Sequence, residues 1–91
     1  QNYPNPFNPV TNITYDVGFV DGPQQQVNLS IYNILGQHVQ TLFRGQQGPG
    51  QYSVMWYGRD KSGASVASGI YFVHMITSAG EVQTKKVMLL R

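Results

Sequence analysis

The feature that most constrains the fold is a two-residue hydrophobic period that recurs along most of the chain. Val27, Leu29 and Ile31 alternate with polar neighbours, and similar alternation returns within residues 12–17 and 52–56. Because successive side chains of a strand point to opposite faces, this period predicts strands with one buried face. Turn-forming residues separate the runs about every ten residues, and no run has a helical period. The pattern predicts an all-β chain folded as an antiparallel β-sandwich.

Six strands follow from the positions of these runs and turns. They are expected over residues 12–17, 27–32, 39–43, 52–57, 70–78 and 81–90. A seventh short strand could come from the segment around Phe7 or from Val66, which gives about seven strands in all. Gly36 and the Ala79-Gly80 pair are expected in turns. Residues 44–50 hold three glycines and Pro49, and we expect them to form a loop.

A proline-rich segment precedes the first strand. Pro4, Pro6 and Pro9 fix their own φ angles and push the residue before each towards extended geometry. We therefore expect an extended segment over residues 1–10 and a folded domain over residues 11–91, with Phe7 docked onto that domain. A chain that starts in this way is expected to be a module of a larger protein.

The composition narrows the classes of partner. The 91 residues suffice for one small domain with a modest core. Only 11% of them are charged, against about 25% in an average domain, and the net charge of +2 predicts no binding to nucleic acid. There is no cysteine, so disulfides and thiol catalysis are excluded. No apolar run approaches the roughly 20 residues of a membrane span, so we expect no insertion into a membrane.

The residues that could carry catalysis are few, and we predict that the chain is not an enzyme and takes no cofactor. His38 and His74 are the only imidazoles, and both fall at outward strand positions. Ser53 and Ser62 lack a recognisable base and orienting group. No glycine-rich phosphate loop precedes a helix.

Asp60 is the residue that most suggests a metal site. Calcium takes six to eight oxygen ligands, usually from several carboxylates, and the four acidic residues of this chain are dispersed. Asp60 and Gly63 instead occupy the first and fourth positions of a type I turn signature. We therefore predict a turn here and no metal.

Trp56 shares the apolar face of its strand with Tyr52 and Val54, which predicts a core position. A carbohydrate-binding module would instead need exposed aromatic side chains. Only Tyr57, Phe72 and Tyr32 qualify for that role, and this alternative remains open at the level of sequence.

The last strand is apolar on both faces over Val87–Leu90. That composition suits a central strand or one that is covered on its outer side. At an edge the same strand would be open to pairing with another chain, and Lys85 and Lys86 would then oppose aggregation. Lys86 and Arg91 could form a positive patch that a partner recognises, or the lysines could serve only to keep the strand soluble.

Several strings carry a resemblance to a known family. They are the segments 4–9, 29–39, 50–52, 56–60, 63–72 and 85–91. Across nearly its whole length the chain resembles the C-terminal sorting domain (type A) of type IX secretion system cargo. Its middle portion also resembles the immunoglobulin-like domain of the flagellar hook-capping protein. Both resemblances imply an immunoglobulin-like β-sandwich.

The resemblance to sorting domains implies a non-catalytic export signal at the C-terminus of a secreted Gram-negative bacterial protein. The implied partners are the outer-membrane secretion translocon, its sorting peptidase and an N-terminal parent domain. The implied location is the cell surface or the medium, reached through the periplasm. The positions implied in recognition are Pro4, Asn5, Pro6, Phe7, Gly36, Gln37, Val39, Lys85, Lys86 and Arg91.

Two other roles stay open beside the export signal. One is a passive structural or spacer module of the hook-cap or fibronectin type, placed beside a catalytic domain. The other is the carbohydrate-binding module considered above.

Overall fold

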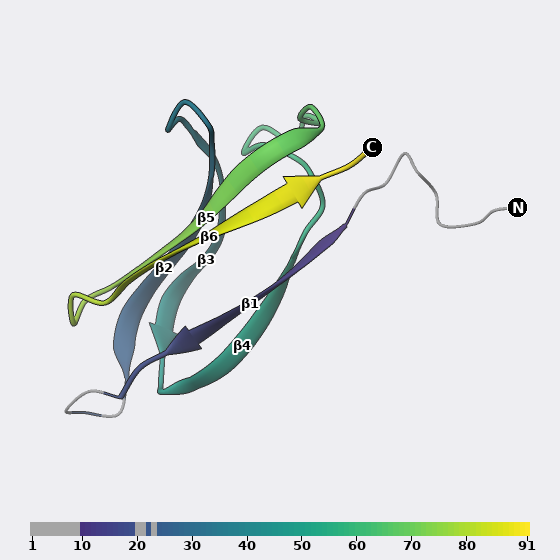
Figure 1. Ribbon diagram of the computed structural model, residues 1–91. Coiled ribbons are helices and arrows are strands. Elements are labelled where there is room, and N and C mark those ends of the chain that lie inside the picture. Colours follow the sequence, from purple (N-terminus) through teal and green to yellow (C-terminus); the bar gives the residue numbers. More distant parts are fainter. Residues whose placement is uncertain (1–9, 20–21, 23) are drawn as a thin grey trace, which may run out of the picture.

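The computed structural model describes residues 10–19, 22 and 24–91 as an antiparallel β-sandwich (Figure 1). Its strands are β1 (Thr11–Val17), β2 (Gln25–Asn33), β3 (His38–Gln47), β4 (Gly50–Trp56), β5 (Gly69–Thr77) and β6 (Val82–Leu89). β1 and β4 form one sheet, and the other has the order β3-β2-β5-β6. The predicted fold class is confirmed. Of the two possible sources of a seventh strand, Val66 lies outside the strands, next to an isolated bridge between Arg59 and Ser65, and Phe7 lies outside the described residues.

The core lies between the two sheets and is made by the inward residues of the alternating runs. Trp56, at 2% exposure, is its largest side chain, and its ring meets that of Tyr71 edge-on at a centroid distance of 5.0 Å. In β5, Tyr71, Val73 and Met75 are all buried and alternate with the outward His74. Tyr71 of β5 and Leu89 of β6 are both buried, and their strands are neighbours in the larger sheet. Side-chain alternation therefore decides which residues fill the core.

The predicted loop over residues 44–50 is wrong. β3 continues to Gln47 because its second half pairs with the first half of β2, with Gln25 opposite Gln47 and Val27 opposite Gly45. A Cβ at Gly45 would lie 3.2 Å from Cζ of Phe43, so the glycine leaves room for that ring. The long-range pairing outweighs the low strand propensity of glycine. Only residues 48–49 remain between β3 and β4.

β6 lies at an edge of the larger sheet in the described part of the chain, which decides between the two placements left open by the sequence. Leu89 is buried at 1% exposure, whereas Met88 and Leu90 are 58% and 71% exposed. Near the end of this strand, the outer side is thus apolar and uncovered within the described residues.

β1 begins and β6 ends at the same end of the sandwich (Figure 1). Thr11 pairs with Trp56, and Leu89 packs against Gly58 just beyond it. β1 and β6 therefore run antiparallel along the seam between the sheets, although they belong to different sheets. Among the described residues, no helix has the length and apolar character required to cross a bilayer.

Candidate functional site

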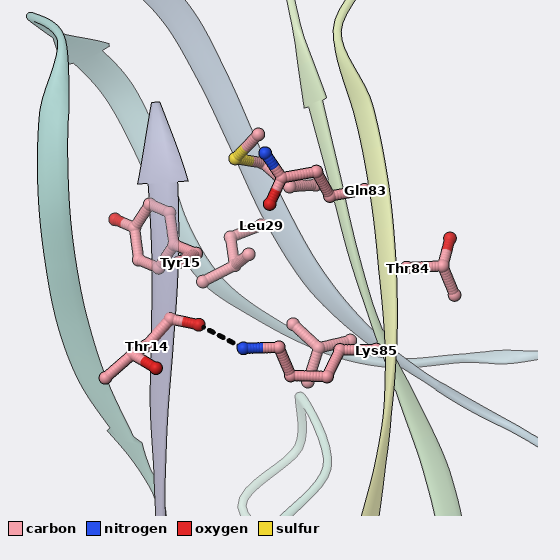
Figure 2. Close-up of a pocket in the computed structure, with 8 residues that line it drawn as sticks. Thr14, Tyr15, Leu29, Gln83, Thr84 and Lys85 are labelled. Atoms are coloured by element: carbon pink, nitrogen blue, oxygen red, sulfur yellow. Dashed lines mark hydrogen bonds between the residues drawn. The ribbon is translucent and has the colours of Figure 1, made fainter. Parts of the chain in front are cut away.

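Side chains, rather than paired backbones, join β1 to β6 along the seam between the sheets. Three successive residues on one side of the β6 segment reach the backbone of the β1 segment. The bonds are Lys85 Nζ to Thr14 O (2.8 Å, dashed in Figure 2), Gln83 Nε2 to Asp16 O (3.0 Å) and Gly18 N to Glu81 Oε1 (3.0 Å). The regular spacing follows from the two-residue period of a strand. We call these three contacts the seam ladder.

An open cavity of about 270 Å³ lies at the seam ladder. Leu29, Val73 and Met75 line its inner part, and Tyr15 lies at its β1 side (Figure 2). Leu29 and Met75 are at most 1% exposed, so the cavity leads directly to the core. The seam therefore encloses a space between β1 and β6 that borders the core.

Arg91 fastens the end of the chain to the loop between β4 and β5. Its guanidinium donates from Nε to Val66 O and from Nη2 to Gly58 O, and its backbone N donates to Ser68 Oγ at 2.9 Å. Hydrogen bonds from a charged donor are stronger than neutral ones. Arg91 thus makes a structural contact at this end of β6.

Replacing Arg91 should therefore destabilise the domain. We expect Arg91→Ala to lower the free energy of unfolding by about 1–2 kcal/mol, since two partly exposed charge-assisted bonds are lost. Lys86→Ala is the matched control, because Lys86 is exposed and should change stability by less than about 0.5 kcal/mol. Urea unfolding followed by Trp56 fluorescence measures both. Equal effects of the two substitutions would contradict the assignment.

Asp60 organises the turn that it was predicted to begin. Its Oδ1 accepts bonds from Ser62 N (2.9 Å), Ser62 Oγ (2.6 Å) and Ala64 N (3.0 Å), and Gly63 N donates to Asp60 O. The hydrogen bond from the Ser62 side chain, followed by that from the Ala64 backbone, lowers the pKa of the carboxyl. The predicted turn is confirmed. Over the described residues, no group of three or more potential metal ligands occurs.

The lowered pKa makes stability depend on pH. A carboxyl whose pKa is lower in the folded state contributes stability that is complete above the unfolded pKa of about 3.9 and is lost as the pH falls through the folded value. Asp60→Asn removes this titration while it keeps an acceptor oxygen. We expect the urea midpoint of the variant to fall less steeply than that of the wild type between about pH 5 and pH 2. Parallel curves would contradict the prediction.

The outer face of the larger sheet carries the two histidines. Both flank Tyr32, with ring centroids at 5.5 Å for His38 and 5.9 Å for His74, and His38 Nε2 lies 3.0 Å from Thr41 Oγ1. The predicted outward positions are confirmed. The imidazoles pack against an aromatic ring, and His38 also contacts the Thr41 hydroxyl.

The three aromatic side chains considered for sugar binding do not form one platform. Tyr32 and Phe72 are opposite each other on the outer face of the larger sheet. Tyr57 directly follows the inward-facing Trp56 of the smaller sheet and is 57% exposed. A sugar would need neighbouring rings on one surface, and here two rings lie on one sheet and the third beside the other. The carbohydrate-binding alternative gains no support from this arrangement.

Gly36 and Gln37 lie in the turn between β2 and β3. Gly36 has a φ of 81°, a left-handed conformation that favours glycine. Asn33 holds the turn, since its Oδ1 accepts from Gln37 N at 2.9 Å and its Nδ2 donates to Gln37 Oε1 at 2.8 Å. Val39 is buried at 7% exposure. The bonding role of Asn33 was not predicted, although an asparagine three residues before a turn glycine is a signal for this local bonding.

The structure gathers part of the predicted recognition set at one end. Asn33 pairs with Tyr71 and Gly69 with Leu89, which places the Gly36 turn at the same end of the sandwich as Arg91. Lys85 and Lys86 lie in the middle of β6, away from this end. Pro4, Asn5, Pro6 and Phe7 are outside the described residues. The roles of these residues in recognition stay predictions.

The comparisons with known proteins agree with this fold. A family model described as the FlgD Ig-like domain matches residues 11–81. The match covers β1 to β5 and stops before β6. Neither the curated proteins nor the solved structures give a match to the chain.

Proposed function

The chain belongs to the family of FlgD Ig-like domains, and we propose that it is a non-catalytic structural module that packs end-on against a neighbouring domain. The family type supports a structural role, and the charged side chains of the sites above fit it. Asp60 binds backbone groups of its own turn and Arg91 binds those of the loop between β4 and β5, so both side chains support the local fold.

The distribution of exposed apolar side chains supports end-on packing. Most of the large ones lie at the end where β1 begins and β6 ends. They are Val10, Ile34, Leu35, Tyr57, Ile70, Met88 and Leu90. Exposed apolar side chains that gather at one place mark interaction surfaces. Because β1 begins and β6 ends there too, a domain joined to either strand would lie next to these side chains.

Two double variants, made in the full-length protein, test this proposal. Leu35→Ser with Leu90→Ser changes the apolar end, and Phe19→Ser with Val82→Ser changes exposed positions at the opposite end. All four positions are solvent-exposed, so both pairs should leave the unfolding of residues 1–91 nearly unchanged. We expect only the first pair to speed limited proteolysis near Val10. Equal cleavage of both double variants would contradict the proposal.

A second candidate function is the export signal implied by the resemblance to sorting domains. It is favoured by β6, which lies at a sheet edge outside the matched residues and presents Lys86 beside the exposed Met88. An exposed edge strand of this kind can be read by strand pairing. In this role the partners would be the outer-membrane translocon and its sorting peptidase, and the parent protein would reach the cell surface or the medium. Export of a reporter fused to the chain tests it.

A further inference from the structure

We propose that the seam between β1 and β6 accepts an extended segment of a partner protein. The segment would pair with the open edge of β1 as a third strand of the smaller sheet, with an acidic side chain facing Lys85. This inference goes beyond the proposed structural role, because it concerns the side of the sandwich rather than its apolar end. It holds for either candidate function.

The first support is the state of the β1 edge. The carbonyls of Thr14 and Asp16 are two residues apart, so they point to the same edge of the strand, away from β4. In the described part of the molecule, they accept hydrogen bonds only from the side chains of Lys85 and Gln83. Exposed side-chain bonds contribute little net free energy. The N–H groups of an added strand could therefore replace these donors at small cost.

The second support is the cavity behind the seam ladder. Its 270 Å³ are lined on the inside by Leu29, Val73 and Met75. Side chains of a strand alternate between faces, so a segment paired with Thr14 and Asp16 would direct the residue opposite Tyr15 into this cavity. An apolar side chain there would fill the space beside core residues that are at most 4% exposed and would gain packing contacts with them.

The positive charge of the β6 lysines determines which side chain the partner segment should carry. Lys85 and Lys86 are exposed neighbours on β6, and the described bond of Lys85 is to a carbonyl rather than a carboxylate. An added strand would release the Lys85 ammonium beside the outward side chain opposite Thr14. An acidic residue at that position forms an ion pair, whereas a basic one is repelled. The β6 strand of a second copy would bring its own lysines and fits less well.

The test uses the ¹⁵N-labelled 91-residue chain and the peptide acetyl-Thr-Val-Thr-Leu-Glu-Val-Thr-amide. We expect saturable shifts in ¹H–¹⁵N spectra at residues 12–17 and 83–87. A peptide with lysine in place of glutamate should bind about two- to fivefold more weakly. A peptide with N-methylated glutamate, which cannot donate to Thr14 O, should also lose affinity.

Variants of the chain complete the test. Lys85→Gln should weaken binding of the glutamate peptide to the level of the lysine peptide, and Arg44→Gln on β3, at the opposite edge of the larger sheet, should leave it unchanged. Absence of shifts up to the solubility limit would overturn the proposal, as would shifts centred on β3. Shifts of the seam residues with protein concentration alone would assign the seam to a second copy and overturn it too.

Discussion

Trp56→Ala is expected to lower the free energy of unfolding by about 3–5 kcal/mol, the largest effect of any single truncation that we predict. Trp56 is buried at 2% exposure, contacts the Tyr71 ring edge-on, and donates from Nε1 to Arg59 O at 3.0 Å. The substitution leaves a large cavity between the sheets and frees the Arg59 carbonyl. Domains of this size are stable by about 5–15 kcal/mol, so the variant should be close to unfolding at room temperature.

Tyr57→Ala is the matched control for this prediction. Tyr57 is the next residue along the chain and is 57% exposed, so its truncation should cost less than about 1 kcal/mol. Because the first variant removes the tryptophan, urea unfolding is followed by far-UV circular dichroism in both. A loss below 1 kcal/mol for Trp56→Ala would show that the core does not depend on this side chain.

Gly58→Ala should be the second most damaging substitution, at about 2–4 kcal/mol. Gly58 has a φ of 69°, which disfavours any residue with a Cβ. A Cβ there would also lie 3.2 Å from both Leu89 Cδ atoms and 3.0 Å from Arg91 Nη2. Leu89 is only 1% exposed and has little room to move. The substitution therefore adds a steric clash to backbone strain and displaces the end of β6.

Gly36→Ala separates the two causes. Gly36 has a φ of 81°, but a Cβ there would meet nothing within 4 Å. It should therefore cost only the backbone term, about 1–2 kcal/mol. Thermal unfolding of both variants gives the comparison. If both glycine variants lose the same stability, the close packing of Gly58 against Leu89 and Arg91 has no energetic weight.

The sequence predicted the fold class and most of the core, because both follow from the two-residue period. That period correctly placed Trp56 inside and His74 outside. It failed over residues 44–47, where pairing with β2 outweighs the local turn chemistry of glycine. Local sequence patterns indicate only local conformational preference. The conformation of residues 44–47 is instead determined by pairing with β2, about twenty residues earlier in the chain.

The candidate sites were harder to predict, because they depend on contacts between the two ends of the chain. The roles of Gln83 and Lys85 in the seam ladder require β1 and β6 to be neighbours in space. Nothing in the spacing of β6 alone indicates that its polar side chains reach carbonyls of β1. The bonds of Arg91 to the loop between β4 and β5 are of the same long-range kind.

The resemblance read from the sequence is supported in its coarser part. The middle portion was likened to the immunoglobulin-like domain of a hook-capping protein, and the family match over residues 11–81 confirms this. The resemblance to sorting domains rests partly on the N-terminal proline-rich segment and on the last strand. Both lie outside the matched residues. The structural module is therefore the better-supported function.

The measurement that tests this function most directly is the secretion of a fluorescent reporter fused to Gln1–Arg91. The host is a bacterium with a type IX system, compared with its translocon-null mutant. A structural module predicts that the reporter is retained equally in both strains. Export only in the competent host would contradict this account and would establish the chain as a sufficient sorting signal.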